Sequence, residues 1–416
     1  MPANNPPEQL AIRFEIDDRF ASSLRDGRFV VVVEQNSPSL EQPFDSAAAL
    51  CVAIAKRVRT SEEVVAICVT DRLSTEHCHD PVDTAIALLE AAGKPIILGI
   101  SGKGSSPERV REILARSRSC GIRDFIAVTG DRSDDHPLPD GGGRVGFYEK
   151  GYLDALDALR LAVDADENAH LGAVVNPFKY TVSDQFLQYY KMARKISTGA
   201  DFIVSQAGWD MKKLQELQWF LQMREIGNAV LARVQLLSTD EVAEIPECLP
   251  PGVYMPVPLA GAFQRAARES AAKCHRMQIH RLAMQMVGCR LLGFSGVQVA
   301  GIRDVASLDD LLSAFRECRS QYDDYAHWVE GWNELDGGMS FSPSPTAFYT
   351  FQNLLDPSVP VYDPELSVMT KASLPLPTGM DRVKARVLSW LLSEETPAHI
   401  VKAAQVLLRR NDVKDP

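Results

Sequence analysis

The chain has 416 residues, of which 45% are hydrophobic and 24% charged, and its formal net charge at pH 7 is −11. This length suits two or three average domains, or one large α/β barrel with an extension. The acidic balance argues against a general nucleic-acid binder, which needs a basic face for the phosphates. No window has the roughly 18 uncharged apolar residues that a membrane span requires.

The N-terminal sequence MPANNPPEQLAIRF lacks the basic and apolar regions of a secretory signal. The chain has 8 cysteines, none in a CxxC pair, and several lie inside apolar runs. Such cysteines are typical of the reduced core of a cytosolic protein. We therefore expect a cytoplasmic protein without a membrane segment.

Continuous apolar runs alternate with helical patterns along most of the chain. The strand candidates, in chain order, are 29–34, 64–70, 95–100, 124–130, 171–177, 201–206, 229–237 and 297–302. Continuous apolarity is typical of strands that are buried on both faces of a parallel sheet. Eight such units over about 300 residues predict a (β/α)8 TIM barrel, with a doubly wound open sheet as the alternative.

The pattern changes after about residue 305, where the strand signals stop. We expect an N-terminal segment over 1–24, the barrel over 25–305, and a mainly helical extension over 306–416. The extension contains the helix-like stretch SLDDLLSAFRECRSQYDDYAHWVEGW, a passage rich in Gly, Ser and Pro, and two further helical patterns. Contact with a second copy of the chain is one use for such an extension.

Several apolar runs give way to a polar residue where the strand ends. In a barrel of this class, the chemistry lies at the C-terminal ends of the strands. These residues are Glu34, Thr70, Gly130 with Asp131, Asn176 and Gln206. Any single one of these residues is as readily explained by a strand end that meets solvent as by a binding site. Their recurrence at the same point of several strands predicts a site.

The residue types suggest how this site works. Glu34 follows FVVVV, where loss of water favours the protonated form and supplies an acid at neutral pH. The Gln206 amide offers both a donor and an acceptor, which suits the edge of a pterin-like ring. Asp131 can accept hydrogen bonds from an amide-like heterocycle. We therefore expect recognition of a planar heterocycle.

At these residues the chain resembles the methylenetetrahydrofolate reductases, over roughly residues 25–305. Their first strand ends in a glutamate soon followed by proline, matched by VVVEQNSP, and their fourth ends in Gly-Asp, matched by VTGD. Their sixth strand is matched by GADFIVSQ, residues 199–206. The spacing from the fifth strand places Arg194 and Lys195 on the family's basic pair, and Thr70 falls on its second-strand threonine.

The resemblance implies an oxidoreductase in which FAD takes hydride from NAD(P)H and passes it to the methylene carbon of a tetrahydrofolate. Glu34 would open the five-membered ring as an acid, Asp131 would contact the pterin and tune the flavin, and Gln206 would hold the folate. The residues expected to bind the cofactor are Thr70, Thr129, Gly130, Asn176, Arg194 and Lys195, with the last two serving the flavin phosphates.

Several positions depart from the family, and most of them concern contacts to the flavin or the nicotinamide. The family's third-strand histidine is missing from PIILGI, and Thr129 replaces an arginine. After the sixth strand, Ala207 and Gly208 replace aromatic residues and only Trp209 remains. A flavin-independent, tetrahydrofolate-dependent methyltransferase or demethylase is therefore the alternative function, and a non-catalytic scaffold is a third.

Two further motifs have simpler interpretations. The glycines of GISGKGSS, residues 99–106, allow backbone N–H groups to approach a bound anion. The pattern is not that of a nucleotide P-loop, and a turn before a helix explains it. The adjacent residues EHCHD, 76–80, lack the spacing of common zinc ligands. We interpret them as a polar loop and expect no metal.

Overall fold

The computed structural model describes residues 18–71, 78–103, 105–130, 153–179, 182–245, 249, 253 and 255–337. Its strands form a closed barrel in the order β1 to β8. The assigned pairings, such as β1 with β2 and β7 with β8, are parallel. The strands are β1 (Val30–Asn36), β2 (Val64–Thr70), β3 (Ile96–Ser101), β4 (Asp124–Val128), β5 (His170–Val175), β6 (Phe202–Ser205), β7 (Ala229–Gln235) and β8 (Gly296–Ala300). The predicted (β/α)8 barrel is therefore confirmed, and the open sheet is excluded.

The strand ends differ slightly from the prediction. β2 has its predicted bounds, whereas β1 continues two residues beyond Glu34 to Asn36. β4 ends at Val128 and β6 at Ser205, so Gly130 and Gln206 follow their strands instead of ending them. The buried runs are correctly located because burial on both faces requires continuous apolarity.

Helices follow most of the strands. They are α1 (Arg19–Arg25), α2 (Phe44–Ala47), α3 (Ala49–Arg59), α4 (Pro81–Ala92), α5 (Pro107–Ser119), α6 (Ala155–Ala165), α7 (Val182–Ser197), α8 (Met211–Met223), α9 (Thr239–Ala243), α10 (Val257–Glu269), α11 (Ala271–Leu291), α12 (Val305–Gln321) and α13 (Tyr325–Asn333). The mainly helical character of the chain after β8 is confirmed for its described part. The two predicted helices near the C-terminus lie outside the described residues.

Two long helical stretches are each divided by a capping residue. The Ser270 side chain accepts from Lys273 N and starts α11 directly after α10. Asp324 accepts from His327 N and starts α13 after α12. Ser and Asp compete with helical backbone bonding in this way, which hydrophobic periodicity does not reveal.

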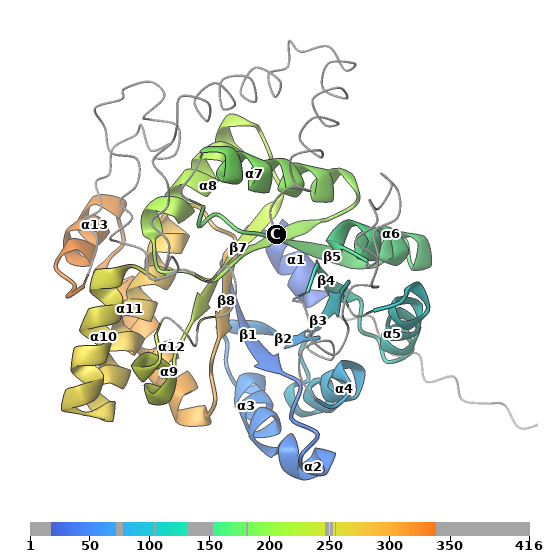
Figure 1. Cartoon of the computed structure of the whole chain (residues 1–416), viewed down its shortest axis with the longest axis horizontal. Helices are drawn as coiled ribbons and strands as arrows, with labels where there is room; N and C mark the ends of the chain where they lie inside the picture. The colour runs from blue at the N-terminus through green and yellow to red at the C-terminus, as the bar shows by residue number, and fades with distance from the viewer. Residues whose placement is uncertain are drawn as a thin grey trace, which may run out of the picture. The chain divides into compact units, whose positions relative to one another are not determined.

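The chain divides into two compact units. The first comprises residues up to Gly172 with Arg303–Val305, and it contains β1 to β4. The second runs from Ala173 to Ile302 and continues from Ala306, and it contains β6 to β8 with the second half of β5. In the first unit α3 packs on α4, and α5 on α6; in the second, α10 packs on α11 (Figure 1).

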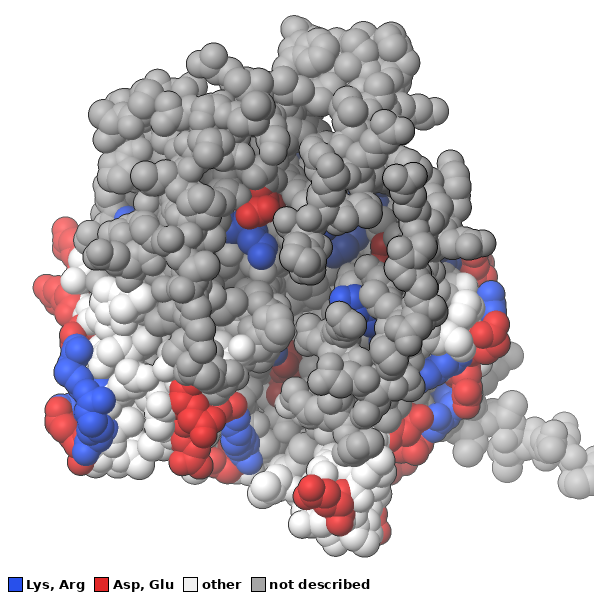
Figure 2. All heavy atoms as spheres, in the orientation of Figure 1, with Lys and Arg blue, Asp and Glu red and all other residues white. Residues whose placement is uncertain are grey.

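The surface of the described residues carries charges of both signs. Figure 2 shows Lys and Arg interspersed with Asp and Glu along the described part of the visible face. No helix in the described ranges combines the length and apolarity that a bilayer crossing needs.

An ion pair lies buried between α7 and α8 in the second unit. Lys213 Nζ lies 2.6 Å from Glu216 Oε1, and the two side chains are 2% and 0% exposed. The hydroxyl of Tyr189 donates to the same oxygen at 3.2 Å. Burial first, and then the Glu216 carboxylate, raise the pKa of Tyr189 well above its ordinary value.

We expect Lys213→Met to lower the free energy of unfolding by about 3–5 kcal/mol, because it removes one charge of a buried ion pair and keeps the other. Urea-induced unfolding followed by fluorescence measures this change. The double variant Lys213→Met/Glu216→Leu should recover most of the loss, since it removes both charges of the pair. The matched control is Lys273→Met, which removes an exposed pair with Glu269 and should cost at most about 1 kcal/mol. Equal effects of the two lysine variants would contradict the prediction.

Candidate functional site

In the first unit, the predicted residues Glu34 and Thr70 lie at the ends of the neighbouring strands β1 and β2, together with Asn36. Glu34 is buried, with 6% of its surface exposed, and pairs in register with Cys68 of β2. Two residues further on, Asn36 Oδ1 accepts a hydrogen bond from Thr70 Oγ1 at 2.8 Å. Asp131 lies outside the described residues, so its predicted role stays a prediction.

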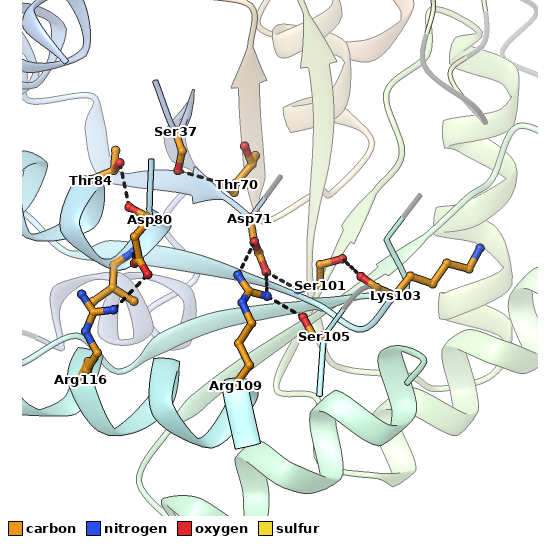
Figure 3. Close-up of polar contacts among 11 residues, drawn as sticks. Ser37, Thr70, Asp71, Asp80, Thr84, Ser101, Lys103, Ser105, Arg109 and Arg116 are labelled. Carbon is orange, nitrogen blue, oxygen red and sulfur yellow. Dashed lines mark hydrogen bonds and ion pairs between the residues drawn. The ribbon is translucent and has the colours of Figure 1, made fainter. Parts of the chain in front are cut away.

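An ion pair next to these residues was not predicted from the sequence. Asp71 follows β2, and both its carboxylate oxygens contact the Arg109 guanidinium of α5, at 3.0 and 3.2 Å (Figure 3). The Asp71 side chain is 0% exposed, and it also accepts from Ser101 N at 3.1 Å. Arg109 further donates to Ser105 Oγ at 2.6 Å. This bidentate pair locks the end of β2 to the end of β3 and the start of α5.

The pair also explains the GISGKGSS segment. Ser101 and Ser105 bond to Asp71 and Arg109, and Ser106 caps α5 by accepting from Arg109 N. Figure 3 shows the Lys103 ammonium pointing away from the Asp71–Arg109 pair. The described part of the segment therefore acts as a turn before a helix, as expected.

The glycine of the VTGD motif is required by close packing. Gly130 has φ +80°, and a Cβ atom there would lie 2.1 Å from Ser101 Oγ. A side chain would therefore both strain the backbone and collide with the end of β3. Glycine here lets the segment after β4 lie directly against β3.

In the second unit, Gln206 is held by an arginine that the sequence did not reveal as part of the site. Gln206 Oε1 accepts from Ala207 N at 2.9 Å and from Arg233 Nη1 of β7 at 3.1 Å. Both neighbours are donors, so the oxygen, and not the nitrogen, must occupy this position. Because the oxygen faces Ala207 and Arg233, the NH2 group is on the side of the amide that is turned away from them.

The same face of β7 carries a second polar residue. Gln235 lies two residues after Arg233, and side chains two apart on a strand point to the same face. Its Oε1 is buried without a hydrogen-bond partner in the structure. A buried acceptor of this kind is rare and is satisfied by a donor from a bound molecule or water. In the sequence, the sign of a polar face on β7 was Arg233, a charged residue inside the otherwise apolar run AVLARV.

The residues expected to bind a cofactor already have partners within the protein. Lys195 Nζ donates to Val174 O at 2.6 Å, and Arg194 donates to the Tyr190 hydroxyl at 3.4 Å. Both lie in the last turn of α7, where cations also stabilise the helix dipole. Asn176 Oδ1 accepts from Phe178 N at 3.0 Å. These described contacts do not form a cradle that fits FAD in particular.

The segment after β6 is closed by apolar packing. A Cβ atom on Gly208 would lie 2.4 Å from the Phe178 ring, so this ring fills the space beside the backbone. Ala207 and Trp209 are buried in an apolar cluster, with 0% and 4% of their surface exposed. Trp209, the one aromatic residue left at the family's aromatic positions, is therefore not presented as an open stacking surface.

The described residues of EHCHD have structural partners. His79 Nε2 lies 2.9 Å from Gln42 O. Asp80 caps α4 by accepting from Val82 N and pairs with Arg116 at 3.0 Å (Figure 3). The remaining residues, 76 and 77, lie outside the described part of the chain.

The comparisons with known proteins agree with the resemblance seen in the sequence. The family model described as methylenetetrahydrofolate reductase matches residues 19–287. No curated protein sequence matches the chain. A protein from Clostridium thermocellum described as binding two copies of 5-methyl-5,6,7,8-tetrahydrofolic acid has a similar fold, with a TM-score of 0.52 at 11% identity over 73% of this chain and 99% of that one.

Other solved structures are more distant. A 2,3-dimethylmalate lyase matches 80% of this chain and 92% of its own with 13% identity and a TM-score of 0.38. A phosphoenolpyruvate phosphomutase from Streptomyces platensis subsp. rosaceus matches 74% and 90% with 11% identity and a TM-score of 0.38. These scores are too low to support an inference about function.

Proposed function

The chain belongs to the methylenetetrahydrofolate reductase family, and on this premise we propose that it interconverts 5,10-methylene- and 5-methyltetrahydrofolate with NAD(P)H as the electron donor. The observation that carries the proposal is the amide of Gln206, whose oxygen is held by Ala207 N and Arg233 directly after β6. The C. thermocellum protein, which shares the fold and is described as binding a methyl-folate, supports the choice of substrate.

Glu34 is the residue that we assign to proton transfer. Opening the five-membered ring breaks the bond between the methylene carbon and N10, and the bonding electrons go to nitrogen. N10 therefore needs a proton, which a buried carboxyl group at the end of β1 can donate. The step leaves a cation at N5 and the methylene carbon, and hydride from the nicotinamide then converts this carbon to a methyl group.

Gln206 is the residue that we assign to binding the pterin. Its NH2 group is a donor, and the oxygen and ring nitrogens of a pterin provide acceptors. By the family resemblance, Asp131 would accept from the opposite, donor-bearing edge of the ring. A donor and an acceptor of this kind orient a neutral heterocycle without needing a net charge.

The test of this proposal is turnover by the purified full-length protein. We expect oxidation of NADH or NADPH that depends on 5,10-methylenetetrahydrofolate and yields 5-methyltetrahydrofolate in equal amount. The visible absorption spectrum of the same sample reports whether FAD, which carries hydride in the resembled family, is bound. A protein that binds no tetrahydrofolate would refute the proposal.

A second candidate is a flavin-independent, tetrahydrofolate-dependent methyltransferase or demethylase. The observation that favours it is the internal hydrogen bonding of Thr70, Asn176 and Lys195, three residues that the resemblance assigns to the cofactor. Methyl-folate formed from a methyl donor, without consumption of a nicotinamide, would establish this alternative. Reductase turnover in the absence of such transfer would exclude it.

A further inference from the structure

Helix α11 carries three buried polar side chains along one face. Spacings of three and four residues place Gln278, Arg281 and Gln285 on the same side of the helix. Gln278 bonds to both backbone groups of Leu237, and Gln285 donates to Gly208 O at 2.7 Å. These two glutamines fasten the segments that follow β7 and β6. Arg281 lies between them and carries a full charge.

Within the described part of the chain, no carboxylate forms an ion pair with the charge of Arg281. Only 3% of the residue is exposed, its Nη2 donates to the backbone oxygen of Asp336 at 2.8 Å, and its guanidinium carbon lies 4.9 Å from the centre of the Trp332 ring. No ion pair with Arg281 occurs among the described residues. The Asp336 carboxylate is exposed and pairs with Arg265 at 3.6 Å.

A buried cation without a counter-ion is unusual, because removing it from water is costly. Burial lowers the pKa of Arg281 to about 10, and Asp336 opposes this only in part. Arg281 therefore stays charged at neutral pH.

The guanidinium lines a small, partly open pocket within the second unit. The pocket is formed by Trp209, Asp210, Met211, Lys212, Pro256, Leu259, Arg281, Trp332 and Gly337. Half-buried Lys212 adds a second cation. The buried carboxylate of Asp210 is the acidic group in the lining, and it caps α8 by accepting from Lys212 N at 3.0 Å. Gly337, with φ +70°, fits closely against Leu259 on the opposite wall.

We propose that this pocket binds the carboxylate of a small molecule, with Arg281 as its ion-pair partner. A planar guanidinium matches the two oxygens of a carboxylate, to which it donates two parallel hydrogen bonds. The apolar walls, which include two tryptophans, strengthen the pair by excluding water. The site is distinct from Gln206 and Arg233 and does not depend on the proposed reaction.

Two sources can supply the carboxylate. One is a separate small acid, and the other is the glutamate tail of a folate, since Trp209 follows Gln206 by three residues on the same segment. The second source rests on the proposed function. Calorimetric titration of the full-length protein with sodium glutamate, 5-methyltetrahydrofolate and tailless 6-methyltetrahydropterin separates them.

The decisive variant is Arg281→Met, which keeps the length of the side chain and removes the charge. We expect its affinity for the carboxylate to fall at least about tenfold, as for the loss of a charged hydrogen bond. A loss for glutamate identifies a separate acid, whereas a loss for the folate but not for the tailless pterin identifies the tail. Glutamate binding that depends on Arg281, in a protein that binds no folate, would support the pocket and refute the proposed function.

Unchanged binding of both carboxylates by Arg281→Met, or no binding of either by the wild type, would overturn the proposal. Arg281→Lys retains the charge and should keep part of the affinity, which separates ion pairing from a folding defect. Lys212→Met, at the partly exposed side, should weaken binding by up to about fivefold. The matched control is Arg265→Met, which removes a cation near Asp336 but outside the pocket and should leave binding unchanged.

Discussion

Glu34→Gln is expected to lower kcat for reduction of 5,10-methylenetetrahydrofolate by about 100-fold or more, the contribution typical of a general acid. Glutamine keeps the size of the side chain and still fits at the end of β1, where only 6% of Glu34 is exposed. It cannot, however, release a proton to N10. The Kd for 5-methyltetrahydrofolate should change by less than about threefold, because the product has no bond left to open. Stopped-flow turnover and calorimetry measure the two quantities.

The control for this variant is Glu63→Gln, which changes a half-buried glutamate just before β2. Glu63 precedes the first residue of its strand, whereas Glu34 lies near the C-terminal end of β1. Glu63 accepts from Ser61 Oγ at 3.0 Å, and its replacement should leave kcat unchanged. If Glu34→Gln keeps full turnover, Glu34 is not the acid. If it lowers kcat and binding equally, Glu34 contributes to binding and not specifically to proton transfer.

The barrel was predictable because its strands follow a simple physical rule. A strand buried on both faces must be apolar throughout, and each such run in the sequence became a strand. Boundaries were less predictable where one polar side chain decides them. Ser270 and Asp324 begin new helices within long helical patterns, and their capping bonds depend on local geometry.

The candidate site was only half predictable for a different reason. Glu34 and Gln206 could be found because strand ends are visible in the sequence. The partner of Gln206 comes from elsewhere in the chain, since Arg233 is 27 residues away. The unpredicted pair of Asp71 and Arg109 likewise joins residues that are 38 apart. Such pairs form only when the barrel brings distant strand ends and helices together. Lys213 and Glu216 resemble an ordinary surface pair in sequence, but the structure buries both and brings Tyr189 of α7 into contact with Glu216.

Gln206→Glu tests the assignment of Gln206 as a hydrogen-bond donor. The new carboxylate would still accept from Ala207 N and Arg233, so the local structure should be kept while the NH2 group is lost. The carboxylate would then face the acceptor edge of the pterin with an oxygen. We expect the Kd for 5-methyltetrahydrofolate to rise at least about tenfold, because a buried acceptor in the ligand is left unpaired.

Two further variants make this result specific. Arg233→Met leaves the glutamine in place but frees its amide to rotate, so it should weaken folate binding by a smaller factor than Gln206→Glu. Gln222→Glu makes the same chemical change at an exposed position of α8 and should leave the Kd unaltered. If Gln206→Glu binds the folate as tightly as the wild type, the amide does not donate to the ligand. The Gln206–Arg233 bond would then stabilise the junction of β6 and β7 without a role in recognition.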